Sequence, residues 1–227
     1  MTPSEKVKTN FVQRLSKASE CHRELMLAVH NKVNQAALET MLVEQFAMLT
    51  AIQWESFLND LIIAYATMSP KTALNGLETR IGKSIQDKFG ERAAKCVTFT
   101  VKKPFTLVKI SKLLDPKDYN ITVKSAGELT SKANDILAAE FAKKFSLDKA
   151  DAQFVDFEVA LRNFLSHRSD SSRDILKGSI QSLTEAQNLF LKAPITNIGT
   201  YLKAKDAAGK TRAVVFAERL VEISQKL

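Results

Sequence analysis

Long stretches of the chain run without a glycine or a proline, and no other feature of the sequence limits its fold as much. Only 7 of the 227 residues are glycine and 5 are proline, so the chain has few of the residues that favour tight turns. A β-sandwich of many short strands needs such turns at regular intervals. The sequence therefore predicts an all-α fold built from a few long helices.

Apolar residues recur at helical spacing along most of the chain. In residues 5–34 they follow steps of three and four, and the segment 36–68 is apolar almost all round, as is typical of a central bundle helix. Further helices are expected at 74–94, 127–145, 149–168, 172–192 and 212–226. The inner side of the 74–94 helix is expected to carry Leu77, Ile81, Ile85 and Phe89. Ser171 or Ser172 is expected to cap the 172–192 helix.

The helical pattern is interrupted between residues 97 and 124. The runs 97–101 and 105–108 are rich in β-branched and aromatic residues, which favour strands. A short β-hairpin or another extended insertion is expected here. The segment is also basic, so Lys102, Lys103 and Lys109 are candidate contacts for RNA phosphates. A solvated lysine face is the alternative interpretation of the same residues.

The chain contains no internal repeat and no low-complexity linker, which favours one domain with peripheral helices. Residues 1–35 are expected to form an amphipathic helix packed on the core. Residues 36–192 are expected to form the helical core, which includes the basic insertion at 97–124, and residues 193–227 are expected to contain a C-terminal helix. Trp54 is expected to lie in the core rather than to stack on a base.

Charge and composition narrow the class of protein. The net charge of +8 attracts polyanions without establishing a nucleic-acid partner. The two cysteines, Cys21 and Cys96, make no disulfide framework, and with three histidines neither a metal site nor a cofactor is expected. The first residues lack the apolar run of a secretory signal. The most apolar stretch, 46–68, contains too many polar and charged residues for a membrane span, so a cytoplasmic protein is expected.

The residues best suited to chemistry lie at the end of the 149–168 helix. Arg162 and Asn163 lie off its apolar stripe, and His167 follows. Arg162 and His167 are about 140° apart on an ideal helix, so they reach one ligand only if the arginine curls round or the helix frays near Ser166. RNA carries its own nucleophile, the 2′-OH, so its cleavage needs proton transfer and positive charge. A histidine supplies the first and a guanidinium the second.

An arginine, a polar residue, three further residues and a histidine form the motif of HEPN domains (higher eukaryotes and prokaryotes nucleotide-binding), and residues 162–167 match its strict short form. The segments of residues 36–192 are also similar in order to the RiboL-PSP-HEPN-like branch, with Glu55 before a Phe-Leu pair and an extended stretch before the motif helix. The resemblance implies a homodimer whose two motifs share a cleft and cleave single-stranded RNA without a metal. It implies catalytic roles for Arg162 and His167 and supporting roles for Asn163 and Glu55.

The same resemblance implies a role in a toxin–antitoxin or anti-phage defence system, with an antitoxin or another defence protein as a partner. Arg168 is either a further RNA contact or a solvent-facing charge. Two alternatives stay open: a HEPN-like domain without catalysis that binds RNA, nucleotides or a partner protein, and an accidental motif in a helical adaptor. Arg23 and His30 fit a looser form of the motif, but Glu24 follows the arginine, so we do not expect this pair to act.

Overall fold

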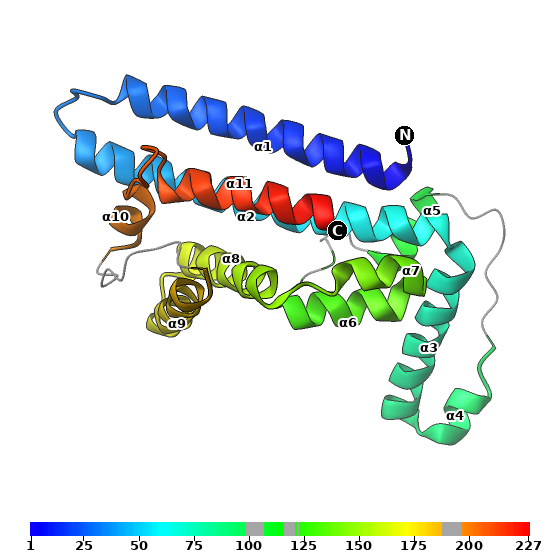
Figure 1. Ribbon diagram of the computed structural model, residues 1–227. Helices are drawn as coiled ribbons and strands as arrows, with labels where there is room; N and C mark the ends of the chain where they lie inside the picture. Colours follow the sequence, from blue (N-terminus) through cyan, green and yellow to red (C-terminus); the bar gives the residue numbers. More distant parts are fainter. Residues whose placement is uncertain (99–106, 116–120, 122, 188–196) are drawn as a thin grey trace.

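The computed structural model describes residues 1–98, 107–115, 121, 123–187 and 197–227, and most of them are helical (Figure 1). In chain order the helices are α1 (Pro3–Ala28), α2 (Gln35–Met68), α3 (Pro70–Phe89), α4 (Glu91–Lys95), α5 (Leu107–Leu114), α6 (Ala126–Ile136), α7 (Ala139–Ala142), the 3-10 turn η1 (Lys143–Phe145), α8 (Lys149–His167), α9 (Asp170–Gln187), α10 (Ile198–Lys203) and α11 (Arg212–Lys226). The described residues contain no β-strand, and Lys205 and Thr211 form an isolated bridge. The predicted all-α fold is confirmed.

Helices α1 and α2 form a long antiparallel hairpin at the centre of the bundle, and α11 and α8 pack against this hairpin (Figure 1). The first helix begins at a capping box, in which the Thr2 hydroxyl accepts from the Glu5 amide and the Glu5 carboxylate accepts from the Thr2 amide. Along the hairpin, Phe11 stacks on Phe57 with ring centroids 4.5 Å apart. Trp54 is buried beside them, so the expectation that it belongs to the core is confirmed.

One hydrophobic core joins residues from α1 to α11. Phe157 of α8 packs edge-on against Phe216 of α11, with ring centroids 4.8 Å apart. Nearer the start of α8, the buried carboxylate of Asp151 forms salt bridges with Arg219 and Lys226 of α11. These contacts hold α8 in a fixed place relative to α11, and α8 carries the motif. None of the helices in the described ranges is both long and apolar enough to cross a membrane.

Helices α3 and α4 extend away from the bundle as an arm (Figure 1). Pro70 begins α3, and within this fully described helix only Ala73 and Leu74 are buried. The predicted inner stripe is therefore wrong toward its end, where Phe89 is 74% exposed. After its first turns the helix has left the bundle, so the stripe has little to pack against. Gly90, with φ of 87°, ends α3 inside the helix expected at 74–94.

Where the arm leaves the bundle, Gly76 allows α3 and α6 to come close. A Cβ atom at Gly76 would lie 1.9 Å from the carbonyl oxygen of Asp135, and a backbone atom cannot rotate away. Gly76→Ala is therefore expected to lower the free energy of unfolding by about 2 kcal/mol, measured by urea denaturation, although alanine favours helices. In the control variant Gly82→Ala the new Cβ meets nothing within 4 Å, so stability should stay equal or rise. Two equally stable variants would contradict this close contact.

Part of the predicted extended insertion is helical. Residues 99–106, 116–120 and 122 lie outside the described residues, and Lys102 and Lys103 fall among them. The strand expected at 105–108 is wrong for residues 107 and 108, which belong to α5. The apolar periodicity of α5 outweighs its β-branched residues, and it places Ile110 in the core. Lys109 lies in α5, but its side chain is outside the described part of the structure.

Two further helices differ from expectation, one by an interruption and the other at its cap. The helix expected at 127–145 is broken, because Leu137 and Ala138 adopt extended backbone angles between α6 and α7. The cap of α9 is Ser169, whose hydroxyl accepts from the Ser172 amide at 3.2 Å, rather than Ser171 or Ser172. The chain therefore turns within two residues after α8.

Candidate functional site

The last turns of α8 present the candidate catalytic residues. Asp148 caps the start of the helix by accepting from the Asp151 amide at 2.8 Å. Phe164 is buried near its end, and the helix continues without fraying to His167. Arg168 then adopts a left-handed conformation with φ of 52° and donates its amide to the carbonyl of Phe164 at 2.8 Å, which closes the helix as glycine commonly does.

Arg162 meets two of the residues that the sequence selected as its supports. Its Nε lies 3.4 Å from Glu55 Oε1, and its Nη2 donates to Glu55 Oε2 at 3.5 Å. Its Nη1 donates to Asn163 Oδ1 at 3.1 Å. The side chains of Arg162 and Glu55 are 35% and 26% exposed, so the guanidinium is oriented by two oxygen-bearing side chains and still reaches solvent. A guanidinium held in this way can turn its outer face to a phosphate.

The contact between Arg162 and Glu55 belongs to a row of contacts between α8 and α2. Ser166 lies next to Met48, with 3.9 Å between Oγ and Sδ, and Arg168 forms a salt bridge with Glu44. Residue numbers rise along α8 as they fall along α2, so the two helices are antiparallel. The row brings charged residues of both helices to one edge of their contact.

Arg168 has structural partners of its own. Besides the salt bridge with Glu44, its guanidinium lies over the ring of Phe164, 5.3 Å from the centroid. Arg173 of α9 approaches the same ring at 6.0 Å. Its side chain is 47% exposed, so Arg168 is a solvent-facing charge that also has structural partners, and it can still meet an anion.

His167 is not joined to Arg162 within one chain. Its side chain is exposed, and within the described ranges no hydrogen bond or ion pair holds it. Because α8 stays helical through residue 167, the two side chains remain about 140° apart around the helix. One chain thus gathers Arg162, Asn163 and Glu55, and His167 stands on another side of the same helix.

The candidate site is an exposed surface rather than a pocket. The hollow beside Glu55, lined in part by Trp54 and Val159, has a volume of only about 10 Å³, which is too small for a ligand. Among the described residues, no group of three or more His, Cys, Asp or Glu side chains is arranged to hold a metal ion. A ligand at this site would lie across the surface rather than in a pocket.

One buried acid lies next to this surface. Glu158 precedes Arg162 by one helical turn and is 2% exposed, and its two carboxyl oxygens have no hydrogen-bond partner among the described residues. Burial raises the pKa of Glu158 to about 8, so the side chain is largely neutral at pH 7. Glu158 is buried too deeply to touch a substrate, so its ionisation is expected to affect the stability of the fold.

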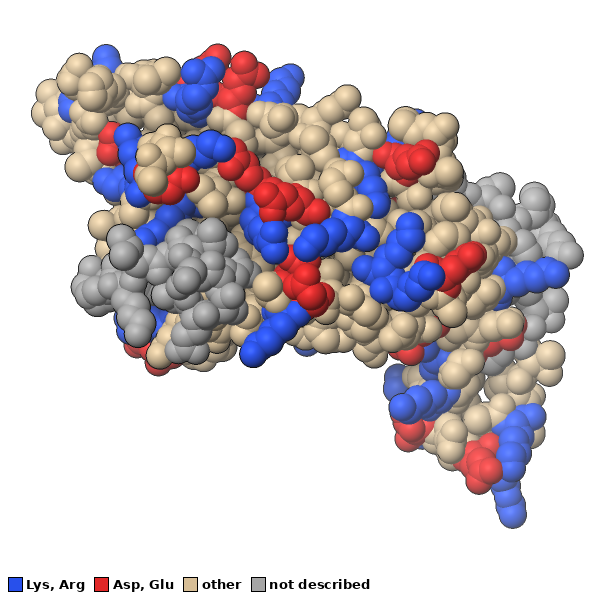
Figure 2. All heavy atoms as spheres, viewed as in Figure 1, with Lys and Arg blue, Asp and Glu red and all other residues tan. Residues whose placement is uncertain are grey.

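Surface charge by itself points to no site on the face that Figure 2 displays. Basic and acidic side chains are interspersed there over the central helices and the arm (Figure 2). Arg23 lies near the C-terminal end of α1, and His30 follows that helix. The Nδ1 atom of His30 is 3.2 Å from Nε2 of Gln35.

Glu44, which holds Arg168, was not predicted from the sequence. The missed signal was its spacing from Glu55. The two glutamates are eleven positions apart in the sequence, which is about three helical turns, so both lie on the same face of α2. A pair of acids on one face of an otherwise apolar helix predicts basic partners on the helix that packs there.

Comparisons with protein-family models, with curated proteins and with solved structures gave no match.

Proposed function

We propose that the protein is a metal-independent endoribonuclease of the HEPN kind, which acts on single-stranded RNA as a homodimer. The observation that carries the proposal is the contact of Arg162 with Glu55 and Asn163 at a solvent-accessible edge of α8. A role in toxin–antitoxin or anti-phage defence, with an antitoxin or another defence protein as partner, belongs to the same proposal and rests on the resemblance.

In this mechanism Arg162 binds two non-bridging oxygens of the scissile phosphate. Glu55 and Asn163 restrict the orientation of the guanidinium, so less rotational freedom is lost when the phosphate binds. The 2′-oxygen attacks phosphorus, the bond from phosphorus to the 5′-oxygen breaks, and a 2′,3′-cyclic phosphate and a 5′-hydroxyl result. His167 accepts the proton of the 2′-OH or donates one to the leaving oxygen. Arg168 and the lysines of the 97–124 segment are proposed as further contacts to the RNA backbone.

Arg162 and His167 lie about 140° apart around α8, and for this reason we propose that a second copy of the chain completes the site. A single chain offers one guanidinium and one imidazole on different sides of α8. A two-fold contact repeats both groups and places the histidine of one copy near the arginine of the other. Apolar side chains are exposed on the adjacent face of α2, namely Met41 and Ile52. Such a face suits a contact between copies.

The dimer can be tested at Ile52, which lies on α2 between Met48 and Glu55. The unmodified protein is expected to scatter light as a particle of twice 25.2 kDa, and Ile52→Arg should yield monomers, because an arginine would be desolvated at the contact. The variant should also lose most RNA cleavage. Ile175→Arg, at an exposed isoleucine of α9, is the matched control and should remain dimeric. An unmodified protein that is monomeric and still cleaves RNA would contradict this assembly.

The reaction itself is tested with a 5′-labelled single-stranded RNA and a DNA of the same sequence in excess EDTA. Cleavage of the RNA alone, leaving 2′,3′-cyclic phosphate ends, is expected because the nucleophile belongs to the substrate. A requirement for a divalent ion, or cleavage of the DNA, would contradict the mechanism. RNA that is bound but not cut under any condition would favour the HEPN-like binding domain without catalysis.

A further inference from the structure

A groove between α1 and α2 has the size of a small-molecule site. Its volume is about 450 Å³, within the range of roughly 300–1,000 Å³ typical of ligand pockets. Its walls are mostly apolar and include Ala18, Phe46 and Leu49. It does not include any residue of the α8 surface, so the mechanism proposed above makes no use of it.

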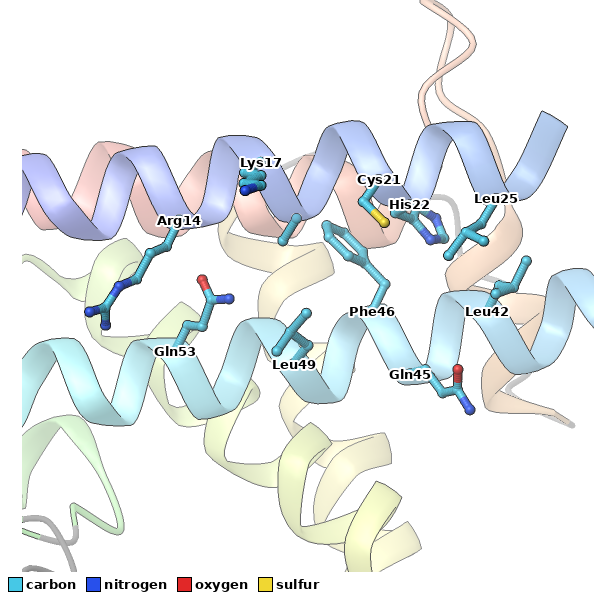
Figure 3. A pocket seen from close by; sticks show the side chains of 11 residues that line it. Arg14, Lys17, Cys21, His22, Leu25, Leu42, Gln45, Phe46, Leu49 and Gln53 are labelled. Atoms are coloured by element: carbon cyan, nitrogen blue, oxygen red, sulfur yellow. The ribbon is translucent and has the colours of Figure 1, made fainter. Parts of the chain in front are cut away.

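The two ends of the groove differ in charge. Arg14 and Gln53 lie at one end, and Leu25 and Leu42 lie at the other (Figure 3). Lys17 adds a second cation near the first. Neither Arg14 nor Lys17 forms a salt bridge with a described residue. The groove thus offers a positive end and an apolar length.

Two buried polar atoms of the groove lack a partner among the described residues. His22 is 5% exposed and stacks on Phe46 with ring centroids 4.4 Å apart, and its Nε2 atom has no hydrogen bond. Gln53 Oε1, at the positive end, also has none. Buried polar atoms nearly always have partners in folded proteins. Both side chains line the same groove, so a ligand bound between them can supply the missing partners.

The spacing of these groups describes the ligand. Arg14 and His22 are eight residues apart on α1, which is about 12 Å along the helix axis. Burial lowers the pKa of His22, so its ring is neutral at neutral pH and offers a hydrogen bond rather than a charge. Gln53 can present either its oxygen or its amide nitrogen, because the two ends of the amide exchange by a simple flip.

We propose that the groove between α1 and α2 binds a small anionic amphiphile, whose carboxylate or phosphate head meets Arg14, Lys17 and Gln53 and whose apolar body carries a hydrogen-bonding group that reaches His22. Charge concentrated at one end favours such a molecule over an acidic helix, which would meet cations along its whole length. Asp60 interacts with Arg14 from α2 and weakens the positive end without removing it.

Three probes of similar length separate the parts of the proposal. In titration calorimetry 10-hydroxydecanoate should bind with one site per chain, decanoate should bind about five- to tenfold more weakly because it leaves His22 unpaired, and 1,10-decanediol should bind at least tenfold more weakly because it lacks the charge. Arg14→Glu should weaken 10-hydroxydecanoate at least tenfold. Asp60→Asn should strengthen it severalfold, and Arg80→Glu on the arm should change nothing.

The two cysteines give an independent measurement. Both are free and exposed, and Cys21 lines the groove whereas Cys96 follows α4 on the arm. In a Cys96→Ser variant, 10-hydroxydecanoate should slow the reaction of Cys21 with a maleimide at least fivefold. In a Cys21→Ser variant the reaction of Cys96 should keep its rate. Ala18→Phe, which fills the floor of the groove, should abolish the protection of Cys21.

Several results would overturn the proposal. Uptake of the probes that never saturates, or that is equal in the unmodified protein and in Arg14→Glu, would indicate adsorption to an apolar surface. Equal binding of decanoate and 10-hydroxydecanoate would remove His22 from the site. A groove closed by a second copy of the chain would show itself if Ala18→Phe changed the mass in light scattering. None of these measurements involves RNA, so their outcome is separate from that of the ribonuclease proposal.

Discussion

Arg162→Ala is expected to lower the rate of RNA cleavage by a factor of about 10²–10³, which is the usual cost of removing a group that stabilises charge in the transition state. His167→Ala should lower it by about 10²–10⁴, the usual contribution of general acid–base catalysis. Both rates are measured under single-turnover conditions with labelled single-stranded RNA in EDTA. Arg162→Lys should recover only a small part of the loss, because an ammonium cannot bind two phosphate oxygens side by side.

The supporting residues and the looser motif provide the controls. Glu55→Gln keeps a hydrogen-bond acceptor but loses the ion pair with Arg162, so its effect should be smaller than that of Arg162→Ala. Arg23→Ala and His30→Ala should cleave RNA at the normal rate. Arg162 and Glu55 form a partly exposed pair worth less than about 1 kcal/mol, so all variants should stay folded. A double variant of Arg162 and His167 that still cleaves RNA would contradict the proposed mechanism.

The helices of the bundle were predictable because their apolar spacing is regular. Residues 212–226 show this most clearly, and the structure places α11 at Arg212–Lys226. Residues 36–68 were predictable for another reason, since they form a long apolar stretch without glycine or proline, and they lie in α2 at Gln35–Met68. Spacing defines which face of a helix is apolar, but it does not say whether another element covers that face. The stripe that ends at Phe89 has regular spacing and lies on an arm with little to cover it. Long-range packing decided that difference.

Breaks without glycine or proline were not predictable. The helix expected at 127–145 stops at Ile136 because Leu137 and Ala138 are extended, and neither residue is a strong helix breaker. In residues 107–114 the β-branched composition and the apolar spacing gave opposite indications. Burial of Ile110 in the core shows that the spacing was the better guide there.

The candidate site was only partly predictable for a similar reason. The motif and the resemblance selected Glu55 and Asn163 beside Arg162, and these three residues are in contact. Their contact depends on the antiparallel register of α8 against α2, which no local pattern encodes. The same register brings Arg168 into a salt bridge with Glu44. Arg162 and His167 could reach one ligand only if the arginine curled round or the helix frayed near Ser166, and α8 stays helical to His167.

Glu158→Gln is expected to change the way in which stability depends on pH. The pKa of Glu158 is raised to about 8 in the folded protein, against a reference value of 4.5, so the unfolded chain releases this proton at a lower pH than the folded chain does. The unmodified protein therefore has the full contribution to stability below about pH 4.5 and loses it as the pH rises toward 8, by about 1.4 kcal/mol per pH unit. Glutamine does not ionise, so the variant lacks this loss.

The measurement is urea denaturation of the unmodified protein and of Glu158→Gln at pH 5 and pH 8, with the two differences compared. Any pH-independent cost of the buried amide cancels in this comparison, and the advantage of the variant should grow by about 3 kcal/mol between the two pH values. Asp60, whose pKa burial also raises, is present in both proteins, so its contribution cancels as well. Glu140→Gln, at an exposed glutamate of α7, is the matched control and should follow the unmodified protein at both pH values. If Glu158→Gln instead shows the same pH dependence as the unmodified protein, burial does not raise the pKa of Glu158. The Glu158 carboxyl would then have a partner that stabilises its charged form.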